Sequence, residues 1–238
     1  MPSLYPLLFS IRSTGWSISL LATHGFLNES FMLARAFLER LVSYIYLLSC
    51  DEDEYGRYLA HTKQKGFRML NRSIEAGKFR AELKSLGSVD LSKDQELKEA
   101  IDLFTSKGGR QVTRWTKAGL PTMLTVIDEK GGLKSPQMGY LMLALLGIYE
   151  QASEALHGTL YGSIFHVGAF TKKLPSTKRE LTETFNENFS MLFQSLGVCI
   201  DSLVRAIDTL VPIDELCKRS TDNTHSISSG KWLPRPET

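Results

Sequence analysis

The residues best suited to acid–base chemistry lie near one another late in the sequence. Glu150, Glu154, His157 and Tyr161 fall within roughly 60° of each other if their segment is a helix that turns about 100° per residue. In such a stripe His157 can serve as a general acid–base, and either glutamate can orient its imidazole ring. The same set also suits a packed histidine that is bonded to a glutamate or to the backbone. We call these four residues the histidine stripe.

A second candidate pair is Arg35 and Glu39, which are separated by three residues in a segment that is nearly all apolar from residue 31 to 48. On a helix they share one arc with Arg40 and Ser43. One interpretation is a narrow solvated stripe that holds a surface salt bridge. The other is that Arg35 and Glu39 face inward and pair with polar groups of the histidine stripe, because two helices this apolar should be neighbours.

The third candidate is a row of basic residues on the next predicted helix. Five side chains lie within roughly 80° of each other at helical spacing. They are Arg57, His61, Lys65, Arg68 and Arg72, and we call them the basic row. Such a row can track a phosphate backbone and so bind RNA. A cationic row is also the usual appearance of the solvated face of a surface helix, so both interpretations fit.

Several kinds of catalytic centre are missing from the sequence. It has no P-loop, no Rossmann glycine pattern, no HExxH and no GxSxG. A di-metal carboxylate bundle would need the Glu-x-x-His pattern twice, whereas Glu154 and His157 form the one copy. The sequence therefore predicts no metal site and no cofactor.

Composition places the chain among ordinary globular proteins. It has 238 residues, 42% of them hydrophobic and 23% charged, with a net charge of +2. This balance argues neither for nor against a nucleic-acid partner. The three cysteines have no ligand-like spacing, which favours reduced thiols in a cytoplasmic protein. No apolar run is long enough for a membrane span, so we expect no membrane partner.

Hydrophobic periodicity predicts an all-α fold without strands. Residues 1–212 should form one bundle domain of about six to seven helices, and residues 213–238 a polar, disordered tail. The first predicted helix begins very close to Met1. We therefore expect that further residues precede Met1 in the native protein. The predicted helices cover residues 4–21, 28–48, 51–76, 92–107, 120–127, 136–162 and 177–211. Their predicted N-cap residues are Asn28, Asp51, Ser92, Ser135 and, for the last helix, Ser176 or Thr177, the latter in a capping box with Glu180.

The segment 136–162 is the most apolar of these helices. Its first half is apolar on nearly every side, which predicts a central helix that is buried all round. Its polar second half carries the histidine stripe, so the predicted site lies at one end of the bundle.

Three segments carry a resemblance to a known family. They read ESFMLARAFLERLVSYIYLL, DEDEYGRYLAHTKQKGFRML and YEQASEALHGTLYG. Over roughly residues 10 to 170 the chain resembles an uncharacterised bacterial all-helical family, known only as a domain of unknown function. The motifs behind the resemblance are the Arg-three-Glu spacing of Arg35 and Glu39 and the Ser-three-His spacing of Ser153 and His157.

That family is similar in turn to the HEPN superfamily of helical bundles, many of them dimeric RNA-cutting toxins or defence effectors. The likeness implies metal-independent RNA cleavage, with a histidine as acid–base and an arginine on the scissile phosphate. The superfamily places both residues on one helix, whereas here Glu150, Gln151 and Ala152 stand where the arginine would be. Arg35 would have to supply the cation from another helix.

Two hypotheses about function follow. In the first, which we favour, the protein is a non-catalytic helical binding or regulatory module of bacterial origin, acting in a defence or stress system. His157 should then be buried and hydrogen-bonded. In the second, the protein is a ribonuclease that uses His157 as acid–base, so His157 should be open to solvent and near both Arg35 and the basic row. In either case the many apolar helices predict a homodimer or another homo-oligomer.

Overall fold

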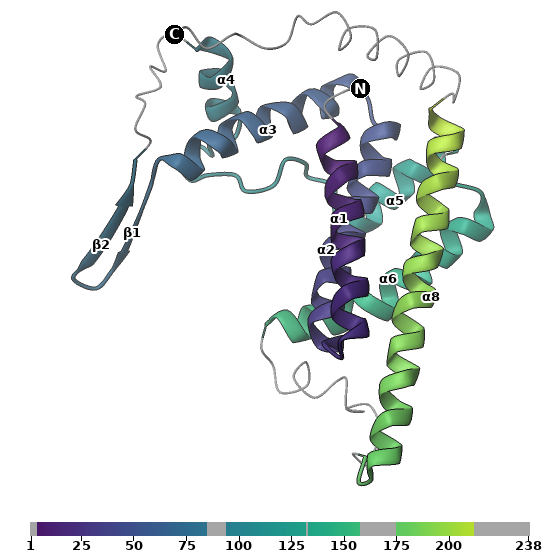
Figure 1. Cartoon of the computed structure of the whole chain (residues 1–238). Helices are drawn as coiled ribbons and strands as arrows, with labels where there is room; N and C mark the ends of the chain where they lie inside the picture. Colours follow the sequence, from purple (N-terminus) through teal and green to yellow (C-terminus); the bar gives the residue numbers. More distant parts are fainter. Residues whose placement is uncertain (1–3, 85–93, 132, 158–174, 212–238) are drawn as a thin grey trace, which may run out of the picture. The chain divides into compact units, whose positions relative to one another are not determined.

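The computed structural model describes residues 4–84, 94–131, 133–157 and 175–211, which belong to two compact units (Figure 1). Unit 1 comprises residues 1–49 and 120–238, and unit 2 comprises residues 50–119. The described part of the chain holds seven helices and one small hairpin, so the all-α prediction is confirmed. The predicted tail lies outside the described residues, and the predicted bundle domain over 1–212 stays a prediction.

Helix α2 is the centre of unit 1, because each of the other helices described there packs against it or against its neighbour α6 (Figure 1). Burying a large apolar side chain stabilises a fold by about 1.5 to 3 kcal/mol. The inner residues of α2 are apolar at helical spacing and are fully buried. They include Phe31, Leu38, Leu41 and Ile45. The helices of the unit are α1 (Tyr5–Thr23), α2 (Leu27–Ser49), α5 (Leu120–Glu129), α6 (Ser135–Leu156) and α8 (Lys178–Leu210).

A tight turn joins α1 to α2. Gly25 has φ +87°, a left-handed conformation that glycine adopts at little cost. The chain re-enters helix at once, because the Ser30 N–H already donates to the Phe26 carbonyl at 3.1 Å. Asn28 therefore lies inside the first turn of α2, and its prediction as N-cap is wrong.

Helix α6 is covered on one side only, so the predicted burial on all sides is wrong. Leu141 and Ile148 are fully buried, whereas Leu143 and Leu146 are 65% and 64% exposed. The helix also begins one residue earlier than predicted, with Lys134 in the N-cap position instead of Ser135. The sequence predicted a central helix, whereas one side of α6 lies at the surface of unit 1.

Helix α8 begins with the predicted capping box, in which Thr177 Oγ1 accepts from the Glu180 N–H at 3.2 Å. One side of the helix is buried through Leu192, Leu196 and Cys199. By length and composition alone α8 could also cross a membrane, a test that core helices of soluble proteins pass as well.

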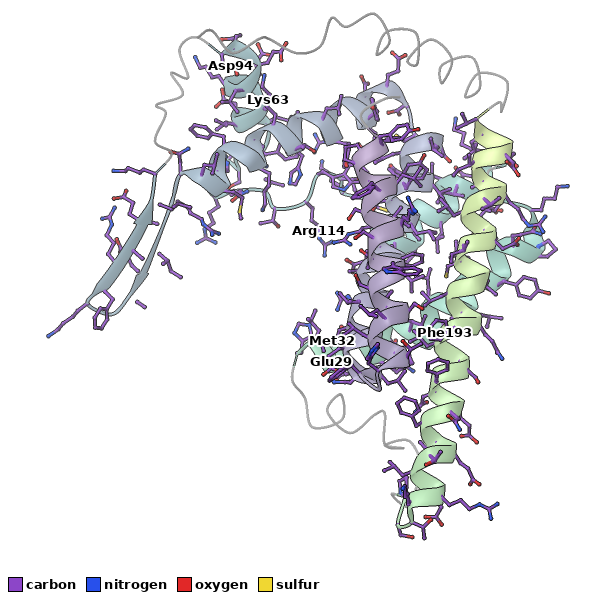
Figure 2. All side chains as sticks on the ribbon, in the orientation of Figure 1. Glu29, Met32, Lys63, Asp94, Arg114 and Phe193 are labelled. Atoms are coloured by element: carbon purple, nitrogen blue, oxygen red, sulfur yellow. The ribbon has the colours of Figure 1, made fainter. Side chains whose placement is uncertain are left out.

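Unit 2 contains α3 (Glu52–Leu70), β1 (Arg72–Ala76), β2 (Phe79–Leu83) and α4 (Gln95–Leu103). The predicted cap of α3 is confirmed, since Asp51 Oδ1 accepts from the Glu54 N–H at 2.8 Å. Asp94 caps α4 in the same way, by accepting from the Leu97 N–H at 2.9 Å, and it takes the role predicted for Ser92, which lies outside the described residues. Lys63 of α3 bonds to Asp94 at 3.1 Å and thereby ties the two helices together (Figure 2).

The prediction that α3 continues to residue 76, without any strand, is wrong. The helix ends at Leu70, and residues 72–83 form an antiparallel hairpin that turns at Gly77. Gly77 has φ +61°, and a glycine first in a two-residue turn suits the twist of paired strands. The hairpin extends beyond the end of α3, with all ten of its strand residues exposed (Figure 1).

Candidate functional site

Arg35 is a polar side chain that joins α2 to α6 within unit 1. Its Nε donates to Glu39 Oε1 at 3.1 Å, one turn further along α2. Its two terminal nitrogens reach across to α6, where Nη1 donates to Ser153 Oγ at 2.8 Å and Nη2 to Tyr149 OH at 3.2 Å. The guanidinium carbon also lies 4.5 Å from the centre of the Tyr149 ring, within the range of a cation–π contact. We call these four residues the Arg35 cluster.

The Arg35 cluster is partly shielded from water, since the Arg35 side chain is 21% exposed. Burial alone lowers the pKa of the guanidinium. The hydrogen bond and charge of Glu39, together with Tyr149, outweigh that effect and leave the pKa of Arg35 raised. Arg35 is therefore a permanent cation whose three nitrogens all bond within its own unit.

Arg35 faces inward as the second interpretation predicts, but its described partners on α6 are Ser153 and Tyr149, which are not members of the histidine stripe, and the salt bridge of the first interpretation also forms. Arg35 crosses to α6, and Arg40 hydrogen-bonds instead to Thr14 of α1. The two motifs of the resemblance meet here, because the arginine of the Arg-three-Glu spacing donates to Ser153 of the Ser-three-His spacing. One bond therefore joins residues that are 118 positions apart in the chain.

The bonds described for Arg35 go to Glu39, Ser153 and Tyr149, not to the four residues of the histidine stripe. His157 is the C-cap of α6, and its backbone N–H donates to the Ser153 carbonyl at 3.0 Å. The residue is exposed to solvent. The expectation that His157 is buried is therefore wrong. Glu150 is also exposed, Glu154 is half-buried, and Tyr161 lies outside the described residues.

Beside the Arg35 cluster, α5 and α6 form an open apolar groove with a volume of about 510 Å³. Such a volume falls within the range of small-ligand and side-chain binding sites. Tyr149 belongs both to the groove and to the cluster. The groove is lined by Leu120, Pro121, Leu124, Thr125, Asp128, Met138, Met142, Leu145, Leu146, Tyr149 and Glu150. Its ionisable carboxyl groups are Asp128 on α5 and Glu150 on α6, and both residues are exposed.

Two members of the basic row pack against α4 within unit 2. The Arg57 guanidinium lies 5.4 Å from the centre of the Phe104 ring, and His61 meets the same ring edge-on at 5.0 Å. His61 Nε2 also lies 3.1 Å from the Thr113 carbonyl oxygen. Burial lowers the pKa of His61, and the charge of Lys65 lowers it further, which outweighs the opposite effect of the Thr113 carbonyl. The ring is therefore neutral at pH 7 and adds no charge to the row.

Arg68 and Arg72, at the other end of the basic row, also bond within unit 2. Arg68 Nη2 donates to Thr105 Oγ1 at 2.6 Å and to the Ile101 carbonyl at 3.3 Å. Arg72 belongs to β1 and donates to Met69 Sδ at 3.7 Å. The row was predicted as one cationic face of a longer helix, and the structure divides it between a packing face and a hairpin.

The described cysteines are poor nucleophiles. Burial raises the pKa of Cys199 to about 12. Burial also raises the pKa of Cys50 to about 11, with help from the charges of Asp51 and Glu54. Both thiols stay protonated at neutral pH, and among the described residues no three His, Cys, Asp or Glu side chains gather as they would around a metal ion.

A family model described as a family of unknown function (DUF5677) matches residues 4–174 of the chain. The chain belongs to this family. No curated protein and no solved structure shows a significant match. The matched region of the family includes α2, α5 and α6, so the Arg35 cluster and the groove both lie inside it.

Sequence reasoning missed Tyr149 and the groove. Tyr149 is one of several aromatic and aliphatic residues in an apolar segment, so its type did not distinguish it from core residues. Its position did carry a signal, because Tyr149 precedes Ser153 by one helical turn and so faces the same way. The groove needs the pairing of α5 with α6, which their separate periodicities do not reveal.

Proposed function

We propose that this protein is a non-catalytic helical binding module, and that the groove between α5 and α6 is its binding site. The observation that carries the proposal is an open apolar depression of about 510 Å³ with carboxylates of Asp128 and Glu150 among its lining residues. An amphipathic helix that lies in such a groove inserts apolar side chains at positions i, i+3 or i+4, and i+7. Basic residues beside those anchors would meet the two carboxylates, which makes an amphipathic basic helix the expected ligand.

The length of the groove fits this ligand. Helix α5 has 10 residues and so spans about 15 Å at 1.5 Å per residue. The anchors i and i+7 of a bound helix are separated by about 10.5 Å, so two turns of ligand fit along α5.

The Arg35 cluster supports binding over catalysis. A phosphate-binding arginine presents its terminal nitrogens to the ligand, as a fork of two donors. In Arg35 both terminal nitrogens already donate to α6, and Glu39 balances the charge. The cluster therefore acts as a brace that fixes α6, one wall of the groove, against α2.

The binding role predicts that a labelled model peptide of leucine and lysine at helical spacing binds the protein, and that the same peptide with glutamate for lysine does not. Leu146→Gln should weaken binding of the leucine–lysine peptide by roughly tenfold to a hundredfold, because burying a leucine side chain is worth about 1.5 to 3 kcal/mol. Fluorescence anisotropy measures both affinities.

Leu143→Gln is the matched control for this experiment. Leu143 and Leu146 are equally exposed leucines of α6, but Leu143 does not line the groove. The control should bind the peptide as the wild type does. Equal loss in the two variants, or equal binding of the two peptides, would refute the groove as the site.

A second candidate function is metal-independent RNA cleavage with His157 as the acid–base. Two observations favour it: His157 is exposed, and Arg35 donates to Ser153, one helical turn before His157. In this reaction the ribose 2′-hydroxyl would attack the adjacent phosphorus while the bond from phosphorus to the 5′ oxygen breaks. His157 would take the proton from the attacking hydroxyl and give it to the leaving oxygen, and Arg35 would face the phosphate with the donors that its bonds leave over.

The binding proposal predicts that the protein does not cut RNA, at low or at physiological salt. The measurement is a gel assay of labelled RNA with the wild type and His157→Ala, each first checked for its helix content by circular dichroism. Cleavage that disappears in a folded His157→Ala variant would establish the ribonuclease and reject the non-catalytic role. Salt-sensitive RNA binding without cleavage would instead indicate that the cations of unit 2 contact phosphate.

A further inference from the structure

The hairpin of unit 2 has two faces of opposite character. Cross-strand neighbours point to the same side, so the pairs Arg72 with Leu83, Ile74 with Ala81, and Ala76 with Phe79 share one face. Five of these six residues are apolar, and we call this side the apolar face of the hairpin. The opposite face holds the pairs Ser73 with Glu82 and Glu75 with Arg80.

The polar face is complete without a partner. Arg80 lies between two carboxylates, with Nη1 3.3 Å from Glu75 and Nη2 3.8 Å from Glu82. Lys84 adds a second cation, 3.2 Å from Glu82. These are exposed ion pairs that water also solvates, so this side has no need of cover.

The apolar face is bare. Phe79 is 84% exposed, and the larger apolar side chains of the face, Ile74 and Leu83, are exposed too. A two-stranded hairpin alone is marginal in water, because it gains stability only when its apolar side packs against something. The last residues of α3, Met69 and Leu70, are also exposed and are separated from the first strand by Asn71.

We propose that the apolar face of the hairpin binds the same face of a second copy of the chain. This inference does not rest on the groove or on the proposed function. The argument lies in the arrangement of large and small residues, since each of the two inner pairs sets a large side chain beside an alanine. Along β1 the order from base to tip is Arg, Ile, Ala, and along β2 it is Leu, Ala, Phe.

A two-fold axis along the strands brings β1 of one copy over β2 of the other. Ile74 then lies over the partner copy's Ala81, and Phe79 over its Ala76, each twice by symmetry. Large side chains thus enter the spaces left by small ones, the condition for close packing between sheets. Arg72 lies over the second Leu83 at the base, where its aliphatic stem can cover the leucine while its charge stays in water.

The expected complex is weak. A stable interface buries about 800 Å² per partner, more than one short hairpin face provides. Self-association should therefore occur at micromolar protein concentrations. Sedimentation velocity of the full chain across that range measures self-association. The experiment compares the wild type with Phe79→Asp and with the control Ser73→Asp.

Wild type and Ser73→Asp should dimerise with the same concentration dependence, and Phe79→Asp should remain a monomer. Both variants add one carboxylate to the hairpin, but on opposite faces. A monomeric wild type at every concentration, a Phe79→Asp variant that still dimerises, or an equal loss in Ser73→Asp would each overturn the proposal.

A second pair of variants tests the packing itself and keeps the hairpin apolar. Ala81→Ile should weaken the dimer, because two isoleucines would then meet across the axis. Adding Ile74→Ala to that variant restores one large and one small residue at the same contact, so the double variant should dimerise again. Failure of the double variant to recover, with helix content unchanged in circular dichroism, would reject this arrangement.

Discussion

Replacing Arg35 with alanine is expected to lower the free energy of unfolding by about 2 to 4 kcal/mol. The loss arises because Glu39, Ser153 and Tyr149 are left without the donor that now joins them across two helices. Hydrogen bonds to a charged group are worth more than neutral ones, and the Arg35 side chain is partly shielded from water. Urea unfolding followed by circular dichroism measures the change.

Arg179→Ala is the matched control. Arg179 forms the same kind of i,i+4 pair, with Glu183 at 2.8 Å, but its side chain is 87% exposed and the bonds described for it stay on α8. Its loss should cost no more than about 0.5 kcal/mol. Arg35→Lys should recover only part of the stability, because one ammonium group cannot reach three acceptors with the geometry of a guanidinium. Equal effects of Arg35→Ala and Arg179→Ala would contradict the bracing role.

Phe37→Ala should be at least as severe, with an expected loss of about 3 to 5 kcal/mol. The Phe37 ring is buried between α1 and α2, where a Cβ added at Gly15 would lie only 3.3 Å from it. This close approach leaves no side chain on α1 at that point that could fill the cavity. Thermal unfolding gives the measurement, and the midpoint should fall by several degrees.

The control for this second prediction is Phe26→Ala. Phe26 stands in the turn before α2 and is more than half exposed, so its side chain contributes little packing. Its backbone carbonyl, which begins α2, is retained in the variant. A change within about 0.5 kcal/mol is expected. If Phe26→Ala were as harmful as Phe37→Ala, burial between α1 and α2 would not be the cause.

The sequence predicted most of the helices, because long apolar periods leave few alternatives, but it gave the central role to residues 136–162, whereas α2 is the helix on which the others of unit 1 pack. It also placed Arg35 and Glu39 together, since a spacing of four residues fixes their relation on a helix. It could not decide whether this pair meets solvent or another helix. That depends on which side of α2 receives α6, and residues far apart in the chain determine it.

The basic row shows the limit of the helical pattern most clearly. Periodicity identified residues that share a face, but it could not identify α4 as the element packed on that face. The pattern also continued through Arg72, although the chain had already become extended. The signal for the hairpin was present in the alternation of polar and apolar residues on both sides of Gly77, and it was outweighed by a long helical period.

Unit 2 is an insertion within the sequence of unit 1, and this has a consequence for how the protein forms on the ribosome. Helices α1 and α2 emerge before the other described helices and can pair at once, since only a short turn separates them. The remaining faces of α2 must wait until residues 50–119 have been synthesised, because α5, α6 and α8 follow them. During that interval α2, the central helix of unit 1, is only partly covered, while the local contacts of unit 2 can already form. The nascent chain therefore passes through a stage at which α2 is a natural target for chaperones.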